Sequence, residues 1–160
     1  KDYSIGDIVT INGVKGIVFQ TSPSVKIVSA KMAKLKWSKE HQITEATDQD
    51  NGKANMAKIR AISDWQSKSP AFKWCADIGD GWYLPAINEL NAIYNQKELI
   101  NRALTANRMK ELDSAGFSLL VSSTEGSYPA ITKGIHFSDG SGYIDNKDRD
   151  HAVRAVYEIK

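Results

Sequence analysis

Residues 79–90 read GDGWYLPAINEL, and the stretch changes character at its centre. Pro85 suits the first turn of a helix, where its missing N–H needs no partner, and it pushes Leu84 towards an extended conformation. The apolar side chains that follow recur at helical spacing: Ile87, Leu90, Ile93 and Tyr94. The stretch therefore predicts a loop anchored by Trp82 and Tyr83 that leads into an amphipathic helix over about residues 85–95.

The sequence on both sides of this stretch is also helical in pattern. Upstream lie two apolar stripes: Ala54, Ala57, Ala61, Ile62 and Trp65 form one, and Ala71, Trp74, Cys75 and Ile78 the other. The first stripe stops near Ser69-Pro70. Downstream, KELINRALTANRMKEL (97–112) predicts a further helix whose buried side carries Leu99, Ile100, Ala103 and Leu104.

Both ends of the chain have strand patterns. In DIVTINGVKGIVFQ (7–20), Asn12-Gly13 supplies the residues that a type I′ turn needs, so the segment predicts a hairpin. Further strands are expected at 25–30 and around Leu35 and Trp37. Near the end, FSLLVSSTE (117–125) predicts a strand that breaks into a polar loop. HAVRAVYEI (151–159) predicts one strand with Val153, Ala155, Tyr157 and Ile159 on one face and Arg154 on the other, paired with an acid.

Strands at both ends with helices between them are typical of an α+β domain whose terminal strands pair in one sheet. At 160 residues the chain can bury a core, so we expect a single domain over 1–160, with a β-rich part at 1–48 and the remainder at 49–160. No apolar run reaches the length of a membrane span. Because the chain begins at Lys1 rather than Met, we expect that an export signal or lipid anchor has been removed.

The charge pattern argues against a nucleic-acid partner. The net charge is only +2, and the densest basic segment is interrupted by apolar residues: Lys31, Lys34, Lys36 and Lys39. Phosphate-binding surfaces carry denser positive charge. A solvated strand or loop edge is the favoured interpretation of these lysines.

The sequence holds no recognisable catalytic or metal-binding motif. The single cysteine, Cys75, lies on an apolar stripe, which favours a buried thiol, and one cysteine can form no internal disulfide. The histidines are not spaced for a local metal grip: His41, His136 and His151. An acidic cluster lacks the glycine and closing glutamate of an EF-hand loop: Asp139, Asp145, Asp148 and Asp150. A solvated loop is favoured there, and we expect no metal and no cofactor.

The order of several segments resembles a family of bacterial exported domains. These segments are WCADIGDGWYLPAINELNAIY (74–94), LINRALTA (99–106), SSTEGSY (122–128), HFSDGSGYIDNK (136–147) and AVRAV (152–156). They are similar to the relatives of the C-terminal domain of the Legionella collagen-like protein and of the Fibrobacter major paralogous domain, which are abundant in gut Bacteroidetes. The resemblance covers about residues 50–158. It implies a C-type-lectin-like fold, with paired terminal strands, flanking helices and a long irregular loop region that presents a ligand surface.

The family pattern also suggests structural roles. Where the family has Trp-Arg-Leu-Pro-Thr, this chain has Ala86 in place of the threonine, which removes a capping box and is expected to leave Glu89 alone. The aromatic pair before the family's Ser-Ser-Thr-Glu is replaced by Leu120 and Val121. In this family the Trp-x-Leu-Pro element belongs to the core, so the resemblance implies that Trp82 and Leu84 are core residues. The apolar helical stripes add Trp65, Trp74 and Leu90 to the expected structural core.

The resemblance favours a non-catalytic binding or display domain, because the calcium-binding loop motifs of true C-type lectins and the paired cysteines of formylglycine-generating relatives are missing. We expect an extracellular or cell-surface protein that contacts a glycan or a host or bacterial surface protein. Tyrosines and short polar residues of the late loops are the predicted ligand contacts: Tyr128, His136, Ser138, Asp139, Tyr143, Asp145, Asn146 and Asp148.

The alternative is a structural module of a surface assembly, such as a pilus or adhesin, without a small ligand. An open edge strand or a large exposed apolar patch would favour that alternative, and a concave polar-aromatic patch on the late loops would favour binding. A hydrolase ranks last, because nothing in the sequence fixes two carboxylates at a catalytic separation.

Overall fold

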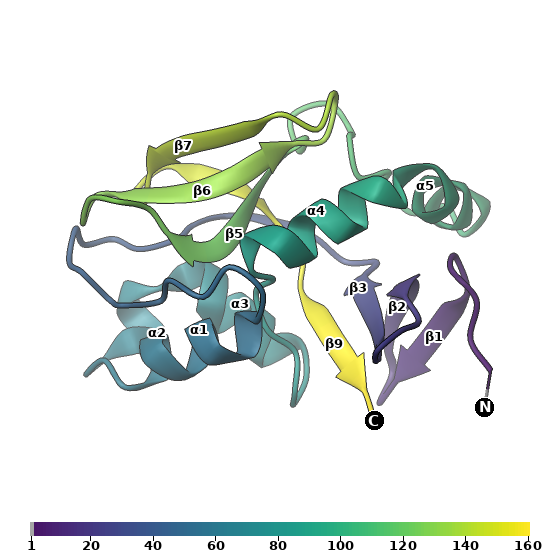
Figure 1. Cartoon of the computed structure of the whole chain (residues 1–160), viewed down its shortest axis with the longest axis horizontal. Coiled ribbons are helices and arrows are strands. Elements are labelled where there is room, and N and C mark those ends of the chain that lie inside the picture. Colours follow the sequence, from purple (N-terminus) through teal and green to yellow (C-terminus); the bar gives the residue numbers. More distant parts are fainter. Residues whose placement is uncertain (1) are drawn as a thin grey trace.

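The computed structural model describes residues 2–160 and has an α+β fold with two sheets (Figure 1). The predicted α+β class is thus confirmed. In chain order the elements are β1 (Ile8–Ile11), β2 (Val14–Gln20), β3 (Val25–Ser29), β4 (Ala33–Lys36), α1 (Gly52–Arg60), α2 (Trp65–Lys68), α3 (Pro70–Ile78), α4 (Ile87–Asn95), α5 (Lys97–Ala106), β5 (Leu119–Glu125), β6 (Ile131–His136), β7 (Gly142–Asn146), β8 (Asp150–Val153) and β9 (Val156–Ile159).

The first sheet has the order β1-β2-β3-β9, with antiparallel neighbours throughout. The predicted hairpin is confirmed: β1 and β2 flank Asn12 and Gly13, whose φ angles of 48° and 85° suit a type I′ turn. We expected the two terminal strands to be paired. They do share one sheet, as expected, but they are not neighbours, because β3 pairs with β9 and leaves β1 at the opposite edge.

The second sheet has the order β4-β8-β5-β6-β7 and curls on itself. Just beyond β4, Ser38 N–H donates to the carbonyl of Lys147, just beyond β7, at 3.1 Å, so the two outer strands meet at one end. The long irregular loop region expected after residue 118 was also wrong. Most of residues 119–146 form β5, β6 and β7: β5 is buried on both faces after Leu119, whereas β7 alternates between exposed and half-buried residues.

The last apolar run is divided between the two sheets. It was predicted as one strand, but β8 belongs to the second sheet and β9 to the first, with Arg154 and Ala155 between them. Arg154 is 2% exposed rather than on an outer face. Its guanidinium donates to four backbone carbonyls instead of to an acid: those of Ser29, Ala30, Lys110 and Glu111. Burial lowers the pKa of Arg154 to about 10.

The helices fill the space around the sheets. In Figure 1, α4 crosses between the two sheets, while α1, α2 and α3 lie below the second sheet. Of the residues predicted for the core, Trp65, Trp82, Leu84 and Leu90 are buried and Trp74 is partly buried against it. Within the described part of the chain, no helix has the length and apolar character needed to cross a membrane.

Candidate functional site

The predicted ligand contacts do not form one surface. Tyr128 lies in the β5–β6 loop, Ser138 and Asp139 in the β6–β7 turn, and Asn146 and Asp148 at the β7–β8 turn. His136, Tyr143 and Asp145 lie on one face of the curled sheet, since Thr132 pairs with Asp145 and Gly134 with Tyr143. The structure thus brings three of the eight predicted contacts together and leaves five distributed over three turns.

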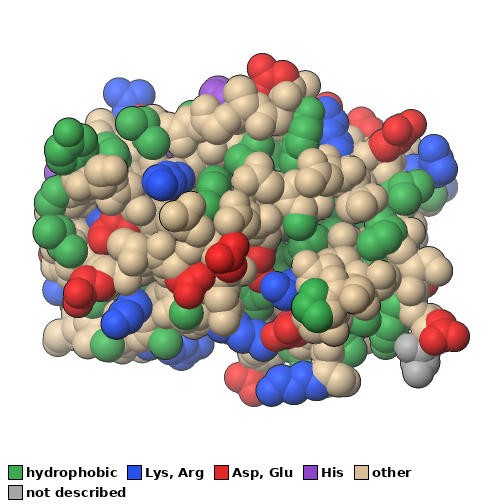
Figure 2. Space-filling view, viewed as in Figure 1, with side chains coloured by type: hydrophobic (Ala, Val, Ile, Leu, Met, Phe, Trp, Pro, Cys, Tyr) green, Lys and Arg blue, Asp and Glu red, His purple; other side chains and the backbone are tan. Residues whose placement is uncertain are grey.

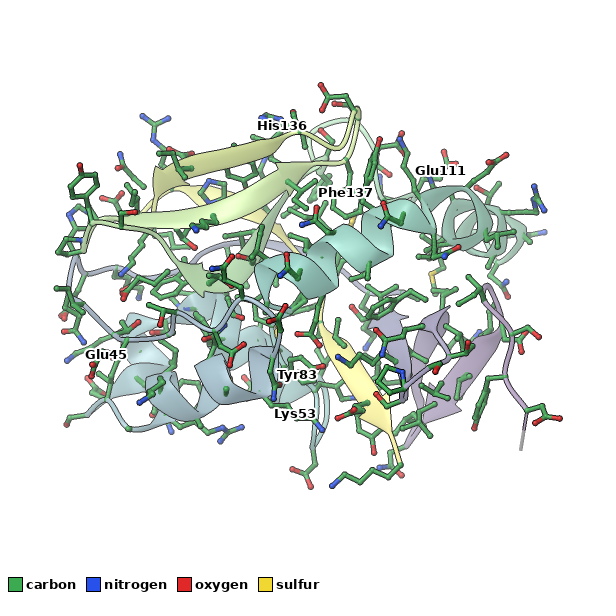
Figure 3. All side chains as sticks on the ribbon, viewed as in Figure 1. Glu45, Lys53, Tyr83, Glu111, His136 and Phe137 are labelled. Carbon is green, nitrogen blue, oxygen red and sulfur yellow. The ribbon has the colours of Figure 1, made fainter. Side chains whose placement is uncertain are left out.

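The three gathered residues surround a fourth, His151, which the ligand-contact prediction omitted. His151 is 2% exposed, and its Nε2 lies 2.9 Å from Oδ2 of Asp145. The ring of Tyr143 stacks on His151 at 5.6 Å between centroids and meets His136 edge-on at 5.2 Å (Figure 3 labels His136). Tyr143 reaches this position only because Gly134 has no side chain: a Cβ there would lie 2.3 Å from its ring.

Two polar atoms of this cluster have no partner among residues 2–160: the hydroxyl of Tyr143 and Nδ1 of His151. Burial, with Asp145 nearby, raises the pKa of Tyr143, so its hydroxyl stays protonated. Burial also tends to raise the pKa of Asp145, but hydrogen bonds from His151 and from the backbone of Asn146 outweigh it and leave that pKa below its usual value. The cluster is packed and largely closed, which suits a structural role inside the curl.

A buried ion pair supports the end of the second sheet that carries Tyr128. Lys147 Nζ lies 2.6 Å from Oε2 of Glu125, with side-chain exposures of 0% and 3%. Lys147 also lies 4.5 Å above the ring of Trp37 and donates to the carbonyl of Gln42. The same Glu125 oxygen accepts from the backbone and hydroxyl of Thr44, so the segments around residues 43 and 128 are fixed side by side. Ile43 and Tyr128 project there with exposures of 67% and 69%.

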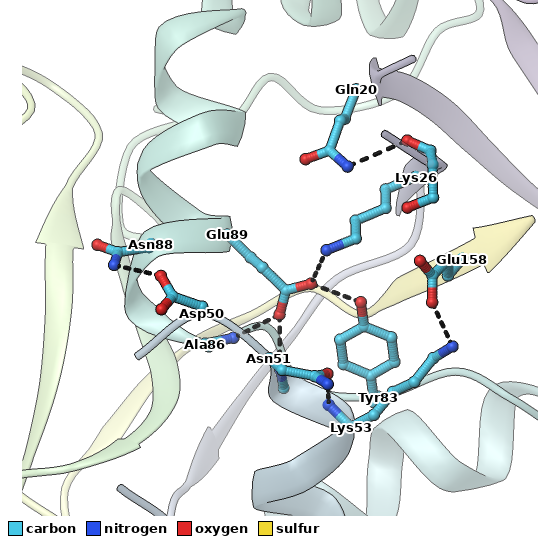
Figure 4. Close-up of polar contacts among 12 residues, drawn as sticks. Gln20, Lys26, Asp50, Asn51, Lys53, Tyr83, Ala86, Asn88, Glu89 and Glu158 are labelled. Carbon is cyan, nitrogen blue, oxygen red and sulfur yellow. Dashed lines mark hydrogen bonds and ion pairs between the residues drawn. The ribbon is translucent and has the colours of Figure 1, made fainter. Parts of the chain in front are cut away.

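Glu89 is the centre of a second buried network, shown in Figure 4. Its carboxylate accepts from the N–H groups of Gly52 and Ala86, which begin α1 and precede α4, and from the hydroxyl of Tyr83 at 2.6 Å. Lys26 of β3 contributes an ion pair at 2.8 Å. The expectation that Ala86 leaves Glu89 alone was therefore wrong. Ala86 removes only the threonine half of a capping box, and the glutamate still caps its own helix and a second one.

Three of the four sheet edges are protected against further strand pairing. Tyr83 exchanges two backbone hydrogen bonds with Val156 and so covers the start of β9, whose free edge also carries Glu158. β4 carries Lys34 and Lys36, and β7 carries Asp145, which points into the curl. Lysines and inward-pointing charges are devices by which natural proteins block edge pairing.

The fourth edge, β1, has no such residue within the strand itself, although a turn at residues 4–7 brings Asp2 and Tyr3 back beside it (Figure 1). Its sequence is Ile-Val-Thr-Ile, with no charge, proline or glycine, and no second strand pairs with it within residues 2–160. Thr10 pairs with Lys15, whose carbonyl is turned away to accept from Ala30 N–H. Thr10 is therefore in a non-hydrogen-bonded pair, and its N–H and C=O point outward. A hollow of about 380 Å³ runs along this edge and is lined by Asp2, Tyr3, Asp7 and Ile8–Ile11.

In the part of the chain that the structure describes, no group of three or more His, Cys, Asp or Glu side chains could hold a metal ion. Cys75 is fully buried, and burial raises the pKa of its thiol. Figure 2 shows acidic and basic side chains interspersed over the face in view, without a patch of a single sign.

Comparisons with known proteins give a structural likeness and no sequence match. No protein-family model and no curated protein matches the sequence. Among solved structures, a fimbrial protein from Bacteroides ovatus matches with a TM-score of 0.60 and 16% sequence identity. The match covers 82% of this chain and 35% of that protein, so this chain spans about a third of its length. At this identity the likeness establishes a shared fold.

Proposed function

We propose that this chain is a non-catalytic structural module of a bacterial surface assembly, exposed outside the cell, which accepts an extended segment of a neighbouring subunit along β1. The open β1 edge is the observation that carries the proposal. Outward backbone groups give affinity in strand addition, and the adjacent hollow offers space for side chains of the added strand.

Two further observations support an assembly role over a small-ligand role. The fold is shared with a fimbrial protein, and a fimbrial subunit must contact its neighbours. Most of the late residues predicted as ligand contacts are used inside the second sheet or spread over separate turns. Ligand binding through those residues, and membership of the lectin-like family that the sequence resembles, remain predictions.

Thr10→Pro tests the proposal most directly. Proline removes the outward N–H of Thr10 but leaves the β1–β2 hydrogen bonds intact, because that N–H takes no part in them. We expect the variant to fold normally, with an unchanged thermal midpoint, and to be lost from high-mass surface material sheared from the producing bacterium. Thermal unfolding followed by circular dichroism would measure the midpoint. Size-exclusion chromatography with light scattering would measure how much of each variant is in the high-mass assembly and how much is monomeric.

Thr10→Val is the matched control, since it keeps the backbone donor and the β-branched shape. It should enter the assembly like wild type. Equal incorporation of the proline and valine variants would refute strand addition at β1, as would a wild-type chain that never leaves the monomeric fraction.

A further inference from the structure

A broad hollow of about 870 Å³ lies along α5, next to Phe137 of the β6–β7 turn, and shares no lining residue with the hollow along β1. Its volume falls within the range of small-molecule sites. Its walls come from the end of α4, the exposed side of α5 and the loop that returns from α5 towards β5; Figure 3 labels Glu111 on that loop.

The floor of the hollow is held rigidly. Asn101 uses both ends of its amide: Nδ2 donates to Asp113 at 3.0 Å, and Oδ1 accepts from Leu112 N–H at 2.7 Å. Lys97 Nζ donates to the carbonyl of Phe137 at 2.7 Å and lies 5.6 Å above the ring of Tyr94. Tyr94 itself meets Phe137 edge-on, so the aromatic wall is fixed before any ligand arrives.

The rim of the hollow, in contrast, carries polar side chains that form no hydrogen bond or ion pair with other described residues. Five exposed residues have no side-chain hydrogen bond or ion pair among residues 2–160: Asn95, Glu98, Arg102, Thr105 and Glu111. Together they offer amide, carboxylate, guanidinium and hydroxyl groups around one aromatic ring. Such groups keep hydrogen-bonding capacity that a ligand can use.

The charges of the hollow decide the class of ligand. Lys97 is ion-paired with Asp113 at 3.1 Å, so the free charges at the rim are Arg102, Glu98 and Glu111. An anion would meet the two carboxylates, a cation would meet the guanidinium, and an apolar ligand would desolvate all three groups. A neutral ligand with many hydroxyl groups can satisfy donors and acceptors of both kinds and lie against the exposed part of Tyr94. We propose that this hollow binds a neutral oligosaccharide.

The test is a titration of the ¹⁵N-labelled chain, followed by NMR, with neutral trisaccharides as probes: maltotriose, cellotriose, mannotriose and chitotriose. At least one should shift the amide signals of Asn95, Arg102 and Glu111 with a Kd of about 1 mM or tighter. Glu98→Ala and Arg102→Ala should each raise that Kd at least about tenfold. Both residues are exposed and unengaged, so neither variant should change folding.

Lys58→Ala is the matched control, because Lys58 is exposed on α1 and far in sequence from the hollow. It should leave the affinity unchanged. A glucuronic acid trimer and the peptide Glu-Lys-Glu-Lys complete the set. The proposal is overturned if no neutral trisaccharide shifts the α5 signals at about 10 mM, if only the charged probes do so, or if the Glu98 and Arg102 variants bind like wild type. None of these outcomes bears on strand addition at β1.

Discussion

Lys147 and Glu125 form an ion pair of 2.6 Å that is sealed from solvent on both sides. The ammonium is enclosed by Trp37 and the carbonyl of Gln42, and the carboxylate by donors from Thr44. Removing one partner of such a buried ion pair is costly, because the remaining charge is then neither paired nor hydrated.

Lys147→Met should therefore reduce the free energy of unfolding by about 3–5 kcal/mol. The double variant Lys147→Met, Glu125→Gln removes both charges and keeps an acceptor for Thr44. It should be more stable than Lys147→Met alone. Urea unfolding followed by circular dichroism gives both values, and a double variant no more stable than the single one would contradict the buried-charge explanation.

The carboxylate of Glu125 should also make the free energy of unfolding depend on pH. Burial tends to raise the pKa of Glu125, but hydrogen bonds from Lys147 and Thr44 outweigh it, so the folded pKa lies below the unfolded value of about 4.5. The stability that this shift contributes is complete above pH 4.5 and is lost as the pH falls through the folded pKa. Unfolding free energies of wild type and Glu125→Gln should differ at pH 7 and converge as the pH falls below 4.5 and through the folded pKa. If the difference between the two unfolding free energies did not change with pH, Glu125 would be excluded as the source of the pH dependence.

Glu89→Ala should destabilise the fold by about 3–5 kcal/mol, because it leaves Lys26, Tyr83 and two helix-starting N–H groups without their common acceptor. Glu89→Gln retains an amide oxygen for the two N–H groups and should lose roughly half as much. Thermal unfolding monitored by calorimetry would rank the two. Equal losses would show that the charge alone, and not the double cap, provides the stability.

Arg154→Lys should cost about 1–3 kcal/mol, although the charge is kept. A lysine ammonium cannot reach carbonyls on both sides as the planar guanidinium does, so buried acceptors between Ser29 and Glu111 would lose their donors. Chemical denaturation measures this, with Arg149→Lys as a control at a position whose side chain is 68% exposed. A similar loss in the control would contradict the proposed role.

Elements coded by local sequence were predicted well. Asn12-Gly13 specifies its hairpin through two positive φ angles, and Pro85 marks the start of α4 within two residues. Helix faces were less accurate: Ala57 and Ala61 of the predicted stripe are exposed, although Trp65 is buried, and α1 instead buries Asn55 and Ile59. Asn55 is buried because its amide bonds the backbone of Asp48 and the hydroxyl of Ser123, partners that periodicity does not reveal.

Contacts between distant segments could not be read from the sequence. Glu89 meets Lys26 across 63 residues, and no local pattern links them. The alternation in HAVRAVYEI fits one strand as well as two, so it could not show that the chain changes sheets at Arg154. The site prediction failed in part for the same reason: Tyr143 and Asp145 were expected on a free loop, whereas strand pairing turns them towards His151.

The passage from β8 to β9 has a mechanical consequence. Tension applied to a strand seated on β1 would be shared across the ladders of β2, β3 and β9, and from β9 it would enter the second sheet along the main chain itself, through Arg154 and Ala155. Pulling forces would thus pass between the two sheets through covalent bonds and not only through packed side chains. The guanidinium of Arg154 holds this connection in place by its hydrogen bonds to neighbouring backbone carbonyls.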